Sequence, residues 1–389
     1  MSPANAIDAV THPDPYPYYT TLRQGPPLAF DDTLQLWVAS RADVVAEVLE
    51  HAALRVRPVT EPVPRGIAGG PAGEVFGRLV RMNDGALHTV HRRVLQRALA
   101  GLDPEGTRNE VLRVARRLPG GPLDEWMFAM PLRALAHLLG FTGEDGPGIA
   151  ADARAFSACL SPLSTREQFD AADAAALSLG DRLRRLLAGR RARPDSLFAA
   201  VLAQAHEDAS VNADTLLANL LGLFSQTCDS TAGLIGQAVV ALAREAGLAT
   251  QVGTRVDGFE LLMQEVARHD PPVQNTRRFV ADGCTVAGVE LHPGDTLLVI
   301  LAAANRDPTL NAEPDAFRLE RVARRNLGFG RGVHACPGQA LAQTFAACGV
   351  QALIEQGIDL NSIRTSGWNY RVSVNGRIPC FGASVVAAR

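Results

Sequence analysis

The chain has 389 residues, of which 47% are hydrophobic and 20% are charged, and its formal net charge is −3 at pH 7. This content can bury a large core, and the small net charge argues against disorder and against a nucleic-acid-binding surface. No lysine occurs, so all 38 basic side chains are arginine. A Walker A phosphate loop, a pyridoxal Schiff base and a kinase-type ATP site all need a lysine amine and are therefore excluded.

The six cysteines are widely spaced, and the closest pair, Cys336 and Cys348, is 12 residues apart. This spacing excludes a C-x-x-C zinc or dithiol site, and six cysteines are too few for a disulfide scaffold. The N-terminus has no charged segment followed by an apolar one, and no apolar run reaches membrane-spanning length. We therefore expect a cytoplasmic protein that does not bind membranes.

The first hundred residues alternate between short elements and loops. Residues 13–30 are rich in proline and tyrosine and are predicted to be irregular. Residues 34–39 predict a strand, and residues 41–49 predict a short helix. Residues 58–73 are rich in proline and glycine and predict a loop.

The middle of the chain, from about residue 86 to 270, has a mainly helical pattern. Asn212 is positioned to cap a long helix that runs to about Glu245. Residues 216–224 are apolar on nearly every face of that helix, which predicts burial on all sides.

After residue 270 the pattern changes to short β-prone pieces at 279–280, 285–289 and 296–300, separated by turn residues. A helix is predicted at about 338–355, and the last 25 residues again predict strands and turns.

Together these elements predict a mainly α fold with a smaller β region. No linker divides the chain, so a single domain over residues 1–389 is expected. The helix-rich parts are about 86–270 and 338–356, and the β-rich parts are about 30–40, 279–300 and 365–389.

The strongest chemical signal is the glycine-rich segment 329–338, with the sequence FGRGVHACPG. Its glycines allow the backbone to pass close to a flat group, and Cys336 stands just before a helix predicted to begin near Gly338. A thiolate at a helix N-terminus is stabilised by the free N–H groups and the helix dipole. Such a thiolate is a good iron ligand, and thiolate ligation of haem favours O–O cleavage.

This segment resembles the haem loop F-G-x-G-x-H-x-C-x-G of the cytochrome P450 superfamily. Other motifs of that family follow in the expected order. They are His88-x-x-x-Arg92, Glu265-x-x-Arg268, an arginine at Arg278, and Ala304-Asn305-Arg306-Asp307-Pro308. The resemblance extends from about Asp14 to the C-terminus and is to the soluble bacterial type.

The resemblance implies a P450-like fold and haem b, with Cys336 as the ligand of the iron. It also implies cofactor contacts from His88, Arg92, Arg278, His334, Phe329, Gly330 and Gly338. Glu265 and Arg268, at i and i+3, share a helix face and are expected to form a buried structural pair.

Residues 226–231 of the long helix align with the family's oxygen-activating turn A-G-x-[DE]-T-T. The resemblance makes Asp229 the acid and Ser230 the alcohol that pass protons. Gln226, Thr227 and Ser230 differ from the family pattern and predict a more polar cavity. We expect Gln226 and Thr227 to affect catalysis as well.

The implied function is a monooxygenase that oxidises a small organic metabolite, as in secondary metabolism. It would use O2 and electrons from a ferredoxin with its reductase or a similar donor. The altered turn keeps open an atypical reaction, namely oxidative coupling or cyclisation, nitration, or peroxide-driven oxidation. The sequence is also compatible with a non-catalytic haem sensor or carrier and with a helical protein that binds no haem.

Two further sets of polar residues have open interpretations. Asn219, Gln274 and Asn275, together with Gln226, suggest a substrate with polar groups. Four arginines precede or belong to the cysteine loop, and they form either a solvated face or a dock for an acidic electron-transfer partner. These are Arg321, Arg324, Arg325 and Arg331.

Overall fold

The computed structural model describes residues 2–188, 193–255, 257–383 and 385–387. These residues form two compact units. The sheet unit comprises Met1–Thr60, Gly233–Cys336 and Asp359–Val385, and the helical unit comprises Glu61–Ala232, Pro337–Ile358 and Val386–Arg389. The single domain expected from the sequence stays a prediction.

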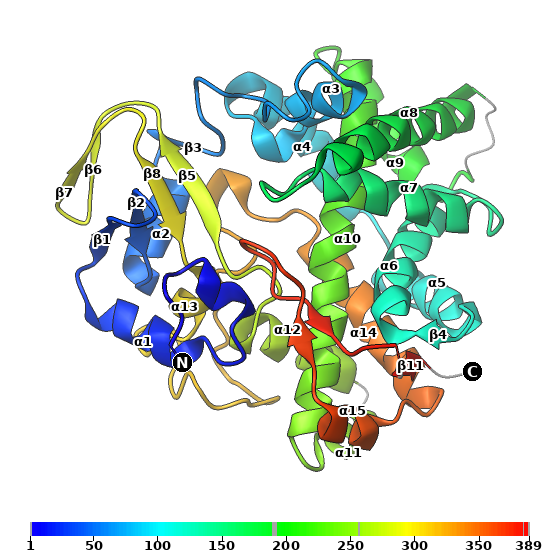
Figure 1. Ribbon diagram of the computed structural model, residues 1–389. Helices are drawn as coiled ribbons and strands as arrows, with labels where there is room; N and C mark the ends of the chain where they lie inside the picture. The colour runs from blue at the N-terminus through cyan, green and yellow to red at the C-terminus, as the bar shows by residue number, and fades with distance from the viewer. Residues whose placement is uncertain (1, 189–192, 256, 384, 388–389) are drawn as a thin grey trace. The chain divides into compact units, whose positions relative to one another are not determined.

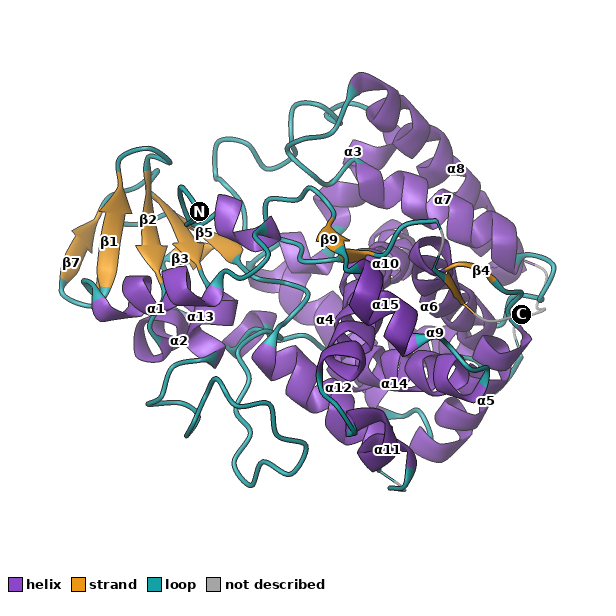
Figure 2. Cartoon of the chain, turned by 60° about the horizontal axis from the view of Figure 1, so that its bottom comes forward, coloured by secondary structure: helices purple, strands orange, loops and turns teal. Residues whose placement is uncertain are grey.

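A five-stranded sheet organises the sheet unit (Figures 1 and 2), and its strand order is β1-β2-β8-β5-β3. Strand β2 pairs parallel with β8, whereas the other neighbours pair antiparallel. The strands are β1 (Leu28–Asp31), β2 (Leu36–Ala39), β3 (Leu54–Arg55), β5 (Thr276–Val280) and β8 (Thr296–Val299).

The central strand β8 is covered on both faces. Leu297 and Val299 pack in one core with helix α2 (Ala42–Glu50), and Leu298 packs in a second core with Tyr16. Successive side chains of a strand point to opposite faces, so a run of apolar residues serves both cores.

The sheet unit contains further elements besides this sheet and α2. They are η1 (Asp8–Thr11), α1 (Tyr16–Gln24), β6 (Cys284–Val286), β7 (Val289–Leu291), α11 (Leu248–Gly253), α12 (Gly258–His269), α13 (Leu301–Asn305), η3 (Gly332–His334), α15 (Leu360–Ser366), β9 (Asn369–Tyr370) and β10 (Pro379–Cys380).

The helical unit is built from helices that pack on one another, for example α7 on α8 and α5 on α14. Its elements are α3 (Pro71–Arg78), η2 (Val80–Met82), α4 (Gly85–Ala100), α5 (Pro104–Arg117), β4 (Gly121–Pro122), α6 (Leu123–Leu139), α7 (Gly146–Ala158), α8 (Arg166–Ala188), α9 (Leu197–His206), α14 (Gln339–Glu355) and β11 (Val386–Ala387).

The long helix α10 (Ala213–Arg244) begins where the sequence predicts, because the Asn212 side chain accepts a hydrogen bond from the backbone N–H of Thr215 at 2.9 Å. The division between the two units falls within this helix, after Ala232. In the segment 216–224, for which the sequence predicts burial on all sides, seven residues are buried and Leu217 and Leu223 are half-buried.

The mainly α fold class with a minor β part is confirmed. Two local predictions are wrong. Residues 13–30 contain helix α1, and residues 285–289 form a hairpin rather than one strand, because Ala287 and Gly288 adopt positive φ between β6 and β7. In the described part of the chain, no helix has the length and apolarity needed to cross a bilayer.

Candidate functional site

The glycine-rich loop holds Cys336 at the surface of the sheet unit. The backbone N–H of Cys336 donates to the carbonyl of Phe329 at 2.7 Å, which closes the loop on itself. Gly330 and Gly332 have φ of +72° and +67°, a region that is unfavourable for residues with a Cβ. The loop therefore needs glycine at these two positions to present the thiol.

Cys336 is the exposed cysteine, whereas Cys159, Cys228 and Cys348 are buried and the other two are half-buried. Burial raises the pKa of the Cys159 thiol to about 11 and that of the Cys228 thiol to about 12. Because the thiolate is the metal-binding form, these two buried thiols are poor ligands. Cys336 is the best candidate for a metal ligand.

Helix α2 supports the same loop. The Arg331 guanidinium forms an ion pair with Glu50 at 2.9 Å. A Cβ on Gly332 would lie 3.0 Å from Cγ of Glu50, so the loop and the end of α2 are in close contact. Arg331 is thus engaged within the sheet unit.

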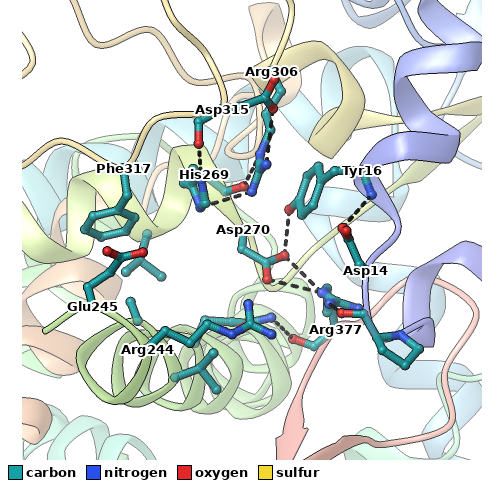
Figure 3. Close-up of a pocket in the computed structure, with 15 residues that line it drawn as sticks. Asp14, Tyr16, Arg244, Glu245, His269, Asp270, Arg306, Asp315, Phe317 and Arg377 are labelled. Atoms are coloured by element: carbon teal, nitrogen blue, oxygen red, sulfur yellow. Dashed lines mark hydrogen bonds and ion pairs between the residues drawn. The ribbon is translucent and has the colours of Figure 1, made fainter.

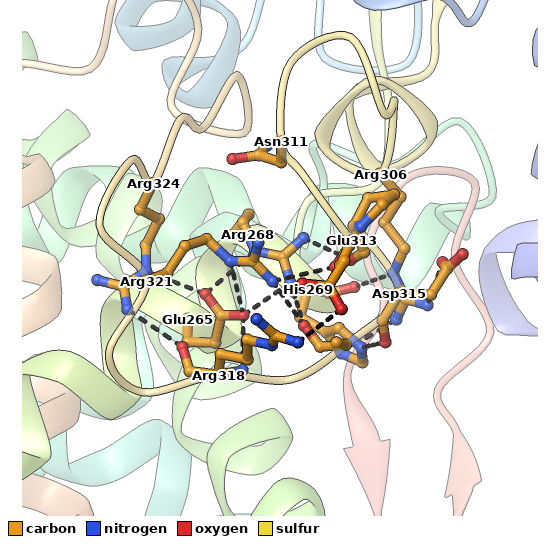
Figure 4. A network of polar contacts seen from close by, with 12 residues as sticks. Glu265, Arg268, His269, Arg306, Asn311, Glu313, Asp315, Arg318, Arg321 and Arg324 are labelled. Atoms are coloured by element: carbon orange, nitrogen blue, oxygen red, sulfur yellow. Dashed lines mark hydrogen bonds and ion pairs between the residues drawn. The ribbon is translucent and has the colours of Figure 1, made fainter.

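Glu265 is the centre of a buried polar network in the sheet unit (Figure 4). It accepts hydrogen bonds from Arg268 at 2.7 and 3.1 Å and from Arg324 at 3.0 Å, and it pairs with Arg321 at 3.4 Å. Burial opposes ionisation of Glu265, but the hydrogen bonds and charge of Arg268, with the Arg318 backbone N–H and the Arg324 side chain, together outweigh it, so the pKa of this carboxyl is lowered. Glu265 and Arg268 form the buried pair that their spacing predicts.

This network corrects the sequence-based interpretation of the four arginines. The side chains of Arg321 and Arg324 are only 7% and 10% exposed, and both point to Glu265 instead of forming a solvated face. Arg325 and Arg331 remain exposed, and Arg331 is paired with Glu50. The segment therefore presents less free positive charge to a partner than its sequence suggests.

The histidines and arginines predicted to contact the cofactor are divided between the two units. In the sheet unit, Arg278 on β5 is buried, and its guanidinium donates to the Arg277 carbonyl at 2.9 Å; His334 on η3 is half-buried. In the helical unit, His88 and Arg92 lie one turn apart on α4, with His88 buried.

His91, the neighbour of His88 on α4, has a structural contact. Its ring nitrogen Nε2 accepts a hydrogen bond from the backbone N–H of Asn212 at 3.1 Å, at the start of α10. Among the described residues, no three histidine, cysteine or acidic side chains are grouped as metal ligands.

One face of α10 is partly exposed to solvent in the middle of the helix, which is otherwise buried. We call this face the open stripe. Leu223, Thr227 and Ser230 are half-buried and Gln226 is exposed, at the i, i+3, i+4 and i+7 positions of one face. Cys228 lies on another side and is buried. This stripe contains three of the four residues expected to affect catalysis.

Hydrogen bonds along the stripe fix two of its side chains. The Ser230 hydroxyl donates to the Gln226 carbonyl, and the Gln226 amide donates to the Gly222 carbonyl at 3.0 Å. The fourth residue, Asp229, is half-buried beside them in the sequence. The Ser230 hydroxyl is therefore bonded to a backbone carbonyl one helical turn earlier, and its own oxygen remains accessible to solvent.

Three amides that the sequence suggests for substrate contacts are used inside the protein. Asn219 is 1% exposed and bonds to three backbone groups. Gln274 is fully buried and bonds to Tyr19 and Asp270, and Asn275 bonds to a backbone carbonyl. The prediction that these three side chains contact the substrate is therefore wrong. Amide residues in a sequence do not show whether nearby backbone groups need them as hydrogen-bond partners.

A second polar cluster, for which the sequence has no signal, borders a cavity of about 370 Å³ in the sheet unit (Figure 3). The buried Asp270 carboxylate accepts from the Tyr16 hydroxyl at 2.6 Å and from Arg377 at 3.0 Å. Arg306 lies over the Tyr16 ring, 3.2 Å from its centroid. The members of this cluster are far apart in sequence, so only the fold brings them together.

The donor types in each unit fit a haem. The sheet unit offers an exposed thiol on a loop whose glycines leave room for a flat ring, together with the cation of Arg278. The helical unit offers His88, Arg92 and the open stripe of α10. A soft sulfur suits iron, and arginine and histidine suit carboxylates.

Comparisons with known proteins agree with this assignment. The family model described as Cytochrome P450 matches residues 260–355, which include the Glu265 network and the cysteine loop. The chain is 29% identical over 309 residues to "Cytochrome P450 144" of Mycobacterium tuberculosis, covering 77% of this chain and 70% of that protein. It is 23% identical over 372 residues to "Biotin biosynthesis cytochrome P450" of Bacillus subtilis, covering 92% of each.

A solved structure extends the likeness to the fold of nearly the whole chain. P450 RauA, complexed with a biosynthetic intermediate of aurachin RE, superposes with a TM-score of 0.80 at 22% identity. The match covers 97% of this chain and 96% of that one.

Proposed function

We propose that this chain is a haem b monooxygenase of the cytochrome P450 superfamily and that Cys336 supplies the thiolate ligand of its haem iron. The observation that carries this proposal is the exposed thiol on a loop closed by the Cys336–Phe329 hydrogen bond. Bound haem supplies the oxidising chemistry, while the substrate, dioxygen and electrons from a redox partner come from outside the chain.

The residues that hold the haem in this proposal are those with matching chemistry. Arg278, His334, His88 and Arg92 pair with its carboxylates, because buried carboxylates need charged or hydrogen-bonding partners. Phe329, Gly330 and Gly338 lie along the ring in the cysteine loop.

In the same proposal, Ser230 on the open stripe of α10 and its neighbour Asp229 take part in catalysis. Ser230 holds a proton at its hydroxyl oxygen, and Asp229 replaces that proton from solvent. In the ground state Ser230 donates to the Gln226 carbonyl, so its O–H bond must turn away from that carbonyl before it can donate elsewhere. Serine also has more freedom about χ1 than threonine, because its Cβ carries no methyl group.

The substrate is a small organic metabolite with an apolar body, in keeping with Leu223 and Gln226 on the stripe. A ferredoxin with its reductase delivers the electrons, and the exposed Arg325 before the cysteine loop is a contact for such an acidic partner. A cytoplasmic location is part of the proposal.

Replacement of the thiol tests the proposal. Cys336→His should abolish the red-shifted carbon monoxide band of the reduced protein, because nitrogen replaces sulfur as the ligand. Cys284→Ser is the matched control and should keep the band. A normal band in Cys336→His would contradict the assignment.

The proton role of Ser230 has its own test. Ser230→Ala should increase the share of consumed electrons that is released as hydrogen peroxide, because the hydroxyl proton donor is lost. Peroxide release and product are measured in the same reaction. Unchanged coupling would refute the relay while leaving the haem assignment intact.

A second candidate function is a P450-type atypical oxidation, that is, coupling or cyclisation, nitration, or peroxide-driven oxidation. It is favoured by Gln226 and Thr227, which place an exposed amide and a hydroxyl where the family has small residues. Product analysis with isotope-labelled dioxygen distinguishes the two, because hydroxylation incorporates the label and coupling does not.

A further inference from the structure

The Gln226 side chain on the open stripe is held in one orientation by its own helix. Its amide nitrogen donates a hydrogen bond to the Gly222 carbonyl at 3.0 Å, one helical turn earlier. A carbonyl oxygen can only accept, so the amide must turn its nitrogen toward Gly222 and its oxygen Oε1 away from it. Among the described residues, no group donates a hydrogen bond to Oε1 of Gln226. This exposed oxygen is therefore an acceptor that a ligand can use.

A buried leucine covers the nitrogen side of the same amide. A Cβ on Gly222 would lie 2.6 Å from Cδ2 of Leu79 and 3.5 Å from the amide nitrogen of Gln226, so both groups meet at this glycine. Leu79 is fully buried, and the next residue, Val80, donates its backbone N–H to the Asn219 side chain at 2.7 Å. The leucine is thus fixed to α10, and its methyl group offers the amide nitrogen no acceptor.

The next turn of the open stripe adds a second acceptor. The Ser230 hydroxyl donates its only hydrogen to the Gln226 backbone carbonyl, so the lone pairs of its oxygen are what it offers to a ligand. Ser230 lies four residues after Gln226, and the two side chains therefore share one face of the helix. This face presents two oxygens, and the hydrogens that belong to the same side chains are bonded to carbonyls of α10.

The apolar part of the stripe makes these acceptors selective. Leu223 is half-buried on the same face, three residues before Gln226. A ligand whose apolar body covers Leu223 displaces water from the neighbouring amide. An acceptor that loses its water without gaining a donor is penalised, so a ligand with an O–H or N–H group binds better than one without. Hydrocarbons, ethers and ionised carboxylates have no such hydrogen.

We propose that Oε1 of Gln226 accepts a hydrogen bond from a hydroxyl or N–H group of the substrate. The substrate class is then small molecules with an apolar body and at least one hydrogen-bond donor, such as alcohols, phenols and indoles. This inference rests on the proposed function, because it names the substrate class of the same site. The amide also keeps one N–H that is available to an acceptor group, and the experiment separates the two modes of binding.

A spectral titration of the ferric holoprotein with matched probes tests the substrate class. The probes are cyclohexanol, indole and 4-phenylphenol, each paired with its O- or N-methylated derivative, which lacks the donor hydrogen. We expect each donor-bearing probe to shift the haem to high spin with a Kd roughly 3- to 10-fold lower than that of its partner, as one neutral hydrogen bond provides. The added methyl group makes the partner more apolar, so hydrophobicity alone predicts the opposite order.

Substitutions at position 226 test whether Oε1 causes the preference. Gln226→Met keeps the length of the side chain but has no acceptor oxygen, so the two members of each pair should bind equally. Gln226→Glu keeps acceptor oxygens but has no N–H, and it should retain the preference. Gln251→Met, at an exposed position of α11, is the matched control and should keep the wild-type ratio of Kd values. A purely structural role of Gln226 would weaken both members of a pair alike.

Several results would overturn this assignment. Equal affinity for both members of every pair in the wild type would show that no donor is recognised, and so would the absence of a spin shift with all three donor-bearing probes. A preference that persists in Gln226→Met would assign recognition to another group. Tighter binding of the methylated probes, lost in Gln226→Glu, would assign it to the remaining N–H. A wild-type protein without the red-shifted carbon monoxide band would instead refute the proposed function.

Discussion

Glu265 in the sheet unit and Arg81 in the helical unit are both charged groups, but they differ in exposure and in their partners. Glu265 is fully buried and has three arginines around it. Arg81 keeps contact with solvent and has no counter-ion among the described residues. A charge that maintains the fold has its partners inside the chain, whereas an open charge is available to a ligand.

The largest expected effect on stability comes from a substitution that breaks the buried network around Glu265. Glu265→Gln keeps the shape of the side chain but leaves the surrounding arginines without their shared counter-ion. We expect the free energy of unfolding to fall by roughly 3–5 kcal/mol, measured by urea titration. Glu74→Gln, which breaks an exposed pair with Arg78, should cost less than about 1 kcal/mol. Similar losses in the two variants would contradict the distinction.

The next effect concerns pH. Burial, aided by the charge of Arg306, lowers the pKa of His269 from 6.5 to about 4. The native ring is therefore neutral, accepting from Arg306 and donating to the Asp315 carbonyl. The unfolded state takes up a proton below pH 6.5 and the native state does not, so stability falls with falling pH between 6.5 and about 4.

The slope of this loss is at most about 1.4 kcal/mol per pH unit. His269→Gln can keep both hydrogen bonds but does not titrate. We expect wild type to lose up to about 2 kcal/mol more than His269→Gln between about pH 7 and pH 5, measured by urea unfolding at each pH. Parallel pH dependences would show that this ring does not control acid stability.

The smallest expected effect tests the difference between Arg81, which forms no ion pair among the described residues, and Arg324, which binds Glu265. Arg81→Gln should change the free energy of unfolding by less than about 0.5 kcal/mol, or raise it, because no ion pair is lost. Arg324→Gln removes a charged hydrogen bond to Glu265 and should cost roughly 1.5–3 kcal/mol. A loss in Arg81→Gln as large as in Arg324→Gln would mean that Arg81 has a structural partner within the chain.

The sequence could predict local features whose causes are local. Asn212 caps α10 because a short polar side chain at that position satisfies a free N–H group. Glu265 and Arg268 meet because i and i+3 share one helix face. The alternation of Leu297, Leu298 and Val299 between two cores follows from the period of a strand.

Helix α1 could not be predicted in the same way. Its sequence, YPYYTTLRQ, is rich in tyrosine and threonine, which have low helix propensity. Tyr16 bonds to Asp270 and Tyr19 bonds to Gln274, at sequence separations of 254 and 255 residues. Tertiary contacts therefore stabilise a helix that its own sequence favours only weakly.

By itself, the sequence determined the fold class, the family resemblance and the position of the proposed thiolate ligand, because these depend on residue types at fixed spacing. The tertiary structure decided which polar side chains have hydrogen-bond or ion-pair partners within the chain and which remain exposed to solvent. Asn219 and Arg324 are engaged with groups far along the chain, whereas Gln226 and Arg81 keep solvent contact. Burial and pairing depend on neighbours that the folded chain brings together, and the order of residues does not specify those neighbours.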